Sequence, residues 1–275
     1  MIIVNAIGEN LEVEEAKRKL NELRREYAAL LAEYDELTGA VRRHLETEYM
    51  MLIGKLEYRL FSLQFQARRL KREISIYQAA ENRGEVVAAA EVEAILDREF
   101  AEYEAALEER QEEIRRAEEH HFCPKLSAEE TRAIRDLYHD LVRKLHPDLN
   151  PDLPDGARQL WEKVVTAYRN NDWLELNILA DRVEDLLEWG RKPDRDLTRM
   201  EEILAEQRRI AQKIDELQKH MRELCSRPPY TYRKLLEDVA AVNARRRELQ
   251  ECIRKFEDHI AELTAIRDEW KGEGK

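Results

Sequence analysis

Residues 138–151 of this chain read YHDLVRKLHPDLNP, the pattern of an amphipathic helix that stops at a proline. Upstream, Ser127 and Glu130 have the spacing of a capping box, in which a hydroxyl and a carboxylate satisfy the free N–H groups of a first helical turn. A helix is therefore predicted to begin at about Ala128. Pro147 lacks a backbone donor and restricts the residue before it, so the helix should end there and lead into a stiff, exposed loop.

This predicted helix has two different faces. Its apolar residues recur at spacings of three and four, and they are Ile134, Leu137, Tyr138, Leu141 and Leu145. The opposite stripe is basic although the chain is acidic, and it carries Arg132, Arg135, His139, Arg143 and His146. We expect the apolar face to pack inward and the basic face to lie outside.

Two further short helices are predicted after the loop. One opens near Asp155, and the other opens at Asp172, whose spacing to Glu175 again suggests an N-cap. Their apolar positions are Leu160, Trp161, Val164, Ala167 and Tyr168 in the first, and Leu176, Leu179, Val183 and Leu186 in the second. Three short helices of this kind can share one small core.

At these residues the chain resembles the DnaJ family, the J-domain co-chaperones. The run from Tyr138 to Pro151 follows that family's second helix and its His-Pro-Asp (HPD) loop. The run from Leu160 to Tyr168 follows its third helix, including the Ala-Tyr ending. We therefore expect residues 122–192 to form a J-domain-like helical module.

The resemblance implies a specific function. In J-domains the basic face of the second helix docks on an acidic surface of a DnaK-type ATPase chaperone, and the HPD aspartate engages the ATPase so that hydrolysis is stimulated. Carried over, it implies that His146, Pro147 and Asp148 form the activating loop. The other residues expected to bind the partner are Arg135, His139, Arg143, Lys144 and Asn150.

The chain also departs from the family. No counterpart of the first helix, with its Tyr-x-x-Leu-Gly signature, precedes Ser127. The basic pair that usually follows the tyrosine reads His139-Asp140, and Leu149 stands where a lysine commonly follows HPD. A predicted helix over residues 85–120 is a candidate substitute for the missing first helix, because the apolar stripe needs more cover than two short helices give.

Composition sets the fold class and excludes several functions. Among 275 residues, 8 Gly and 7 Pro against 39% charged residues indicate an all-α protein of long helices. The formal charge of -12 argues against nucleic-acid binding. No apolar run is long enough for a bilayer, and Met1 to Val4 lack the features of a signal peptide, so we expect a cytoplasmic protein without membrane contact. The three cysteines form no pair motif and are expected to be reduced thiols.

Heptad repeats predict two long coiled-coil helices within an N-terminal region, residues 1–121. The seam of the first is Val13, Ala16, Leu20, Leu23, Tyr27, Leu30, Tyr34, Leu37 and Val41. The seam of the second is Tyr49, Ile53, Leu56, Leu60, Leu63, Ala67, Leu70, Ile74 and Tyr77. Gly39 is predicted to close the first helix and Gly84 to follow the second.

Heptads return in residues 193–275, after a helix-stop signal at Gly190 to Pro193. The first seam there is Met200, Ile203, Gln207, Ile210, Ile214, Leu217, Met221 and Leu224. The second is Leu235, Val239, Val242, Leu249, Ile253, Phe256, Ile260, Leu263 and Trp270. Because the Pro228-Pro229 turn between them is short, an antiparallel helical hairpin is predicted.

The residues favour a binding protein over an enzyme. No phosphate-binding loop, nucleophile or isolated acid/base pair stands out, and no cofactor is expected. His120, His121 and Cys123 lack the fourth ligand of a zinc site, so no metal is predicted. Two functions remain. One is a co-chaperone of a DnaK-type chaperone whose coiled coils bind a client or form a homo-oligomer. The other is a helical scaffold with a degenerate J-like module.

Overall fold

The computed structural model describes residues 2–122, 127–153, 156–189 and 199–273. Within these ranges the chain forms helices joined by turns and contains no strand, so the predicted all-α class is confirmed. The chain divides into two compact units, each built from segments that are far apart in the sequence. We call residues 1–44 and 124–230 the HPD unit, and residues 45–123 and 231–275 the second unit. The predicted boundary after residue 121 lies two residues before a unit boundary, whereas no unit boundary lies at the predicted position after residue 192. The unit boundaries after residues 44 and 230 were not predicted.

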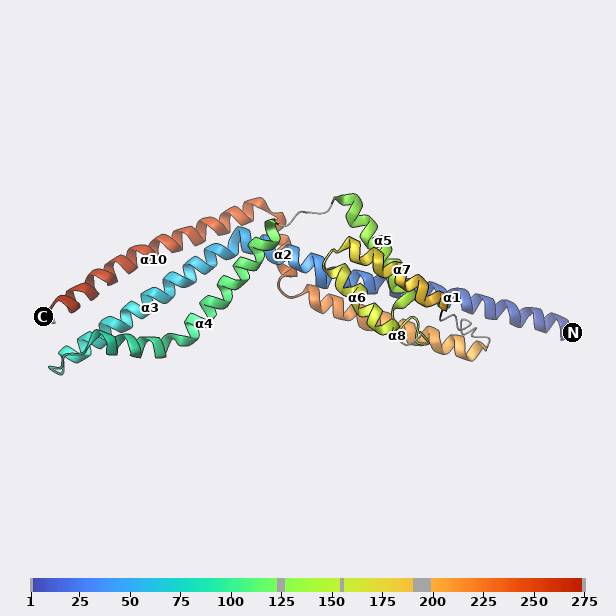
Figure 1. The fold of residues 1–275 in the computed structure, drawn as a ribbon, viewed down its shortest axis with the longest axis horizontal. Coiled ribbons are helices and arrows are strands. Elements are labelled where there is room, and N and C mark those ends of the chain that lie inside the picture. Colours follow the sequence, from blue (N-terminus) through green and yellow to red (C-terminus); the bar gives the residue numbers. More distant parts are fainter. Residues whose placement is uncertain (1, 123–126, 154–155, 190–198, 274–275) are drawn as a thin grey trace. The chain divides into compact units, whose positions relative to one another are not determined.

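Among its described residues, the HPD unit contains two long α-helices and three shorter ones. They are α1 (Ile2–Glu36), α5 (Ala128–Leu145), α6 (Ala157–Arg169), α7 (Trp173–Trp189) and α8 (Met200–Cys225). α1 and α8 lie side by side and run in the same direction (Figure 1). Gln207 Nε2 donates to the Ala16 carbonyl at 2.7 Å, and further along both helices the ring of Tyr34 meets that of His220. The two predicted heptad seams therefore pair in parallel.

The second unit is built around α3 (Lys55–Glu81), which α4 (Ala89–Phe122) and α10 (Val239–Glu273) accompany (Figure 1). Its shorter elements are the π-helix η2 (Met50–Gly54) and the helix α9 (Arg233–Glu237), while α2 (Arg42–Tyr49) and the 3-10 helix η3 (Tyr230–Tyr232) span the unit boundaries. Arg245 pairs with Glu57 at 3.2 Å and Lys271 with Glu73 at 2.6 Å, so α10 runs parallel to α3.

The predicted hairpin of the last two long helices is corrected by these pairings. α8 packs on α1 in the HPD unit, and α10 packs on α3 in the second unit. A short turn favours an antiparallel pair only when the two helices bury their stripes against each other. Here each stripe finds a more distant partner, and the long intervening segments allow the parallel direction. All four seams close within one chain.

The predicted helix end at Gly39 is also wrong. The chain stays helical there through the π-helix η1 (Leu37–Val41), which follows α1 directly. A Cβ on Gly39 would lie 3.3 Å from the Arg169 side chain, so the glycine permits a close approach of the end of α6. Gly84, by contrast, has the positive φ of 66° that suits a helix end, and α3 stops three residues before it, as predicted.

One apolar core unites the HPD unit. Tyr138, Leu141 and Leu145 of α5 are buried in it together with Leu20, Tyr27, Ala28, Leu31 and Ala32 of α1 and with residues of α6, α7 and α8. The cover that the α5 stripe needs therefore comes from α1. The predicted substitute, the helix over residues 85–120, is α4, which belongs to the second unit. That hypothesis is corrected.

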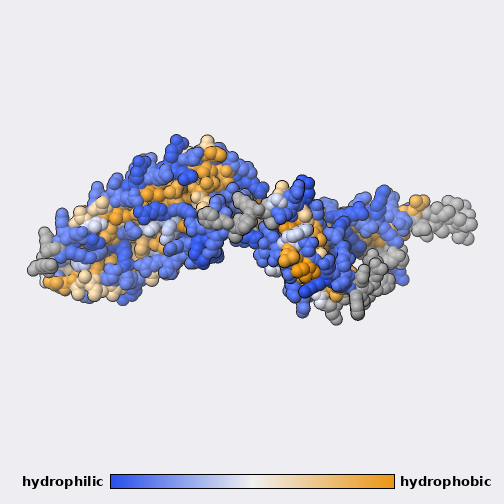
Figure 2. Space-filling model, turned by 45° about the horizontal axis from the view of Figure 1, so that its top comes forward, coloured by the Kyte–Doolittle hydropathy of each residue, from blue (hydrophilic) through white to orange (hydrophobic). Residues whose placement is uncertain are grey.

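The surface is dominated by charge. The face in Figure 2 is mostly hydrophilic, with apolar side chains in strips and small patches. No helix in the described ranges combines the length and apolar character needed to cross a membrane. Three features of the sequence fall outside the described residues: Cys123, Asp155, near which a helix was predicted to open, and the helix-stop signal from Gly190 to Pro193.

Candidate partner-binding site

The HPD loop begins where the sequence predicts it. The capping box at the start of α5 is present, with Ser127 Oγ accepting from the Glu130 N–H at 3.1 Å and the Glu130 carboxylate accepting from the Ser127 N–H at 2.8 Å. At the other end His146 leaves the helical region, with φ -62° and ψ 126°, as a residue before proline should. α5 therefore has its predicted bounds.

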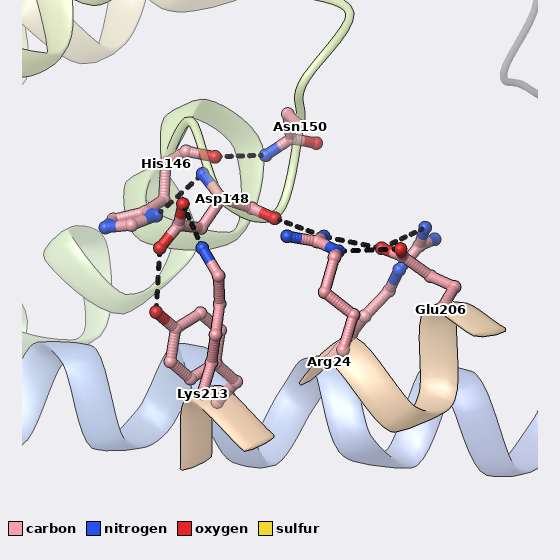
Figure 3. A network of polar contacts seen from close by, with 8 residues as sticks. Arg24, His146, Asp148, Asn150, Glu206 and Lys213 are labelled. Atoms are coloured by element: carbon pink, nitrogen blue, oxygen red, sulfur yellow. Dashed lines mark hydrogen bonds and ion pairs between the residues drawn. The ribbon is translucent and has the colours of Figure 1, made fainter. Parts of the chain in front are cut away.

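The loop after α5 is a tight turn held by its own hydrogen bonds. The His146 carbonyl accepts from the N–H groups of Leu149 and Asn150, both at 3.0 Å. Asn150 Nδ2 also donates to the Arg143 carbonyl at 2.8 Å, which satisfies a free carbonyl of the last turn of α5. Asn150, predicted to bind a partner, thus acts within the loop, and Figure 3 shows it turned back toward His146.

His146 lies between two aromatic rings. Its ring centroid is 5.1 Å from that of Trp161 on α6 and 6.2 Å from that of Tyr27 on α1, both in edge-on contact. Its Nδ1 accepts from the Asp148 N–H at 3.1 Å, so the neutral ring carries its proton on Nε2. Burial lowers the pKa of His146, against the opposing charge of Asp148. The imidazole is therefore neutral near pH 7 and part of the loop's support.

Both carboxylate oxygens of Asp148 are engaged by other helices of the HPD unit. Tyr27 of α1 donates its hydroxyl to Oδ2 at 2.8 Å, and Lys213 of α8 pairs with Oδ1 (Figure 3). Arg209 of α8 donates to the Asp148 backbone carbonyl at 2.9 Å. We call Tyr27, Arg209 and Lys213 the Asp148 clamp. The Asp148 side chain nevertheless remains 37% exposed, so it is reachable from solvent.

The clamp changes the ionisation of both groups that meet in it. Burial acts to raise the pKa of Asp148, but the hydrogen bonds from Lys213 and Tyr27 outweigh it and lower that pKa. Burial and the bond to Asp148 raise the pKa of the Tyr27 hydroxyl. Asp148 is therefore a carboxylate, and Tyr27 a neutral donor, over the physiological range of pH.

Arg209 is itself held in place. Glu206, one turn earlier on α8, accepts two hydrogen bonds from its guanidinium, at 2.6 and 2.7 Å. Arg24 of α1 lies 3.9 Å from the same carboxylate, and its buried Nε has no hydrogen-bond partner among the described residues (Figure 3). This second layer of charges fixes the Arg209 side chain toward the loop.

The predicted basic docking face is largely paired within the chain. Arg135 forms an ion pair with Glu36 of α1, and Lys144 forms one with Glu184 of α7. Asp140 lies 2.7 Å from both Arg143 and Lys144. The Arg143 side chain is still 55% exposed, which makes it the most accessible of these basic residues.

His139 is half-buried. Burial, followed by the positive charge of Arg135, lowers the pKa of His139. The ring is therefore neutral near pH 7 and contributes no charge to the docking face. Of the four basic-face positions predicted to dock a partner, Arg143 and Arg135 keep a charge on an exposed side chain, at 55% and 47%, and each is ion-paired within the chain.

Two residues of the resemblance have structural roles. Tyr138 is fully buried, stacks on Tyr168 with ring centroids 3.7 Å apart, and donates its hydroxyl to Asp35 at 2.5 Å. Arg169 donates to the same carboxylate at 2.8 Å. Leu149, in place of the usual lysine, is buried in the core. The departure at Leu149 therefore strengthens the packing of the loop and removes a charge from its surface.

The clamp residues were not predicted as functional. Tyr27 lies on a predicted heptad seam, and the one signal that points to a further role is its hydroxyl, since a buried tyrosine usually finds a hydrogen-bond partner. Arg209 and Lys213 are charged residues beside a seam, as in any coiled coil, and carried no signal. Comparison of the chain with known protein families, curated proteins and solved structures finds no match. The resemblance to J-domains therefore rests on the motif residues.

Proposed function

We propose that this protein is a J-domain-type co-chaperone, which binds a DnaK-type ATPase chaperone through the HPD loop and stimulates its ATP hydrolysis. One observation carries the proposal. His146, Pro147 and Asp148 form a tight corner between α5 and α6, and the Asp148 side chain at this corner is 37% exposed. An HPD sequence at such a corner is what the J-domain resemblance requires.

The rigidity of the HPD loop and the basic residue next to it favour binding of an acidic partner. Pro147 and the internal hydrogen bonds fix the loop before binding, so little conformational entropy is lost when a partner engages it. Arg143, one turn before the loop, has an exposed side chain whose pair with Asp140 lies at the surface, so its positive charge is open to exchange with an acidic partner. Steering of this kind weakens as salt is added.

The long helices are the proposed surface for clients, and the cytoplasm is the proposed location. The seams of α1 with α8 and of α3 with α10 are already filled within the chain. A client would therefore bind the outer faces of the helices rather than a heptad seam.

A helical scaffold with a degenerate J-like module is the second candidate. The specific observation in its favour is that Arg135, Lys144 and Asp148 already have partners within the chain. In this case the HPD residues serve only to turn the chain between two helices.

ATP turnover of a DnaK-type chaperone separates the two candidates. The co-chaperone proposal expects the full chain to accelerate hydrolysis and His146→Gln to abolish the acceleration. His220→Gln, an exposed histidine on α8, is the matched control and should behave as the wild type. An unchanged rate at low salt, over a wide range of concentration, both with the wild type and with variants of the Asp148 clamp, would favour the scaffold.

A further inference from the structure

The carboxylate on which the proposed function depends is already bound. Tyr27 and Lys213 each take one oxygen of Asp148, and Arg209 takes the backbone carbonyl of the same residue. A partner that engages the Asp148 carboxylate therefore finds a donor already on each oxygen, and it must share or displace these donors. The contact competes directly with the proposed partner for the same atoms.

The competing donors come from outside the helix-loop-helix that carries the motif. Tyr27 lies 121 residues before Asp148 in the sequence, and Arg209 lies 61 residues after it. Neither α1 nor α8 is needed to make the corner itself, because the hydrogen bonds that shape the corner run between residues of α5 and the loop. The clamp is thus separable from the loop that it holds.

A second contact from α1 works in the same direction. Glu36 pairs with Arg135 on the basic face of α5, and Glu36 belongs to the same helix as Tyr27. Within the chain, Glu36 therefore pairs with the docking residue Arg135, and Lys213 pairs with the docking residue Asp148. A chaperone would therefore find the charges of both Arg135 and Asp148 already neutralised within the chain.

The clamp is made of contacts that can open without unfolding the core. The side chains of Lys213 and Asp148 are 28% and 37% exposed, and such half-exposed ion pairs are readily exchanged for water or another partner. Ile210 and Ile214, which flank the clamp on α8, are buried in the core and hold the helix in place while the side chains move.

We propose that the clamp is autoinhibitory: Tyr27, Arg209 and Lys213 hold Asp148 in a closed state, and the DnaK-type chaperone binds the fraction of molecules in which Asp148 is released. This inference rests on the proposed co-chaperone function. When only part of a population is competent, apparent affinity falls in proportion to that part. Loosening the clamp should therefore increase potency without altering the activating loop.

The test measures the concentration of full-length protein that gives half-maximal stimulation of the chaperone's ATPase. Lys213→Ala and Tyr27→Phe should each lower it several-fold, and the double variant by about tenfold or more, as the competent fraction rises. His146→Gln should abolish the stimulation of ATP hydrolysis in the wild type and in each clamp variant. The matched controls are Lys219→Ala, at an exposed lysine on α8, and Tyr34→Phe, at a half-buried tyrosine on α1. Both should leave the half-maximal concentration unchanged.

Each outcome decides a different point. If the wild type stimulates hydrolysis and the clamp variants are equal or weaker, autoinhibition is wrong while the co-chaperone function stands. If neither the wild type nor any clamp variant stimulates, the proposed function fails and the clamp has nothing to inhibit. A silent wild type with active clamp variants supports both. Lys213→Gln, which keeps the stem, and circular dichroism of each variant separate clamp release from misfolding.

Discussion

Tyr27 Oη lies 2.8 Å from Asp148 Oδ2, although Tyr27 belongs to a coiled-coil seam and Asp148 to the HPD loop. One side chain thus serves two purposes. Its ring is buried in the core shared by α1, α5 and α8, and its hydroxyl reaches the loop. The state of the loop is therefore tied to the pairing of the long helices, and a change in one will be felt in the other.

Removal of the Tyr138 hydroxyl tests the buried link between α5 and α1. Tyr138→Phe leaves the Asp35 carboxylate, itself buried, with Arg169 as the one donor described for it. An unmet buried acceptor costs about 1–3 kcal/mol, and we expect the free energy of unfolding in urea to fall by that amount.

Tyr34→Phe is the control for this variant. Tyr34 lies one residue before Asp35 on α1 but is only half-buried, and its hydroxyl makes no hydrogen bond within the described residues. Its removal should change the free energy of unfolding by less than about 0.5 kcal/mol. Equal losses for the two variants would show that the Tyr138 hydroxyl contributes nothing through Asp35.

Truncation of the α5 stripe tests the cover that α1 provides. Leu141 is 1% exposed, so Leu141→Ala leaves a cavity and should lower the free energy of unfolding by about 2–5 kcal/mol. Leu174 on α7 is 72% exposed, and Leu174→Ala should cost under about 0.5 kcal/mol. A mild loss at Leu141 would mean that the stripe is not sealed by α1.

Stability should fall as the pH drops below about 6.5, the ordinary histidine value. Burial lowers the pKa of His146 and of His139 in the folded chain. Below about pH 6.5 these histidines are therefore protonated more in the unfolded chain than in the folded chain. The stabilisation is complete above the unfolded pKa and is lost as the pH falls toward the lowered folded pKa. A second loss is expected below about 3.9, where the unfolded carboxyl of Asp148 takes up a proton that the folded one, with its lowered pKa, refuses.

Urea unfolding between about pH 8 and pH 5 measures the histidine contribution. His146→Gln should flatten the dependence of the free energy on pH, and the double variant with His139→Gln should flatten it further. A slope in His146→Gln identical to that of the wild type would show that the ring is not shielded between Trp161 and Tyr27.

Closure of all four seams within one chain predicts a monomer. α1 pairs with α8 and α3 with α10, so an oligomer would need another surface. Light scattering should give a mass near 32.7 kDa at every concentration tested. A mass of twice that value would indicate that the seams exchange between chains, as coiled coils with filled heptads are able to do.

Local signals in the sequence predicted much of this structure. The capping box at Ser127, the N-cap at Asp172, the proline corner and Gly84 each act within a few residues, and each appears where expected. Partner choice between helices could not be predicted in this way. A heptad repeat shows which stripe of a helix is buried but does not show which other helix covers it. The parallel helix pairs were therefore not predicted, and neither was the contact of Tyr27 with Asp148.

We expect a DnaK-type chaperone to engage the Asp148 carboxylate of the HPD loop. The test is the binding of the ATP-bound chaperone to the immobilised full chain, compared between the wild type and Asp148→Asn. The amide weakens the pairing with Lys213 but cannot supply the charge, so we predict loss of binding by about tenfold or more even though the clamp is loosened. Binding of Asp148→Asn as tight as that of the wild type would show that the chaperone does not engage this carboxylate.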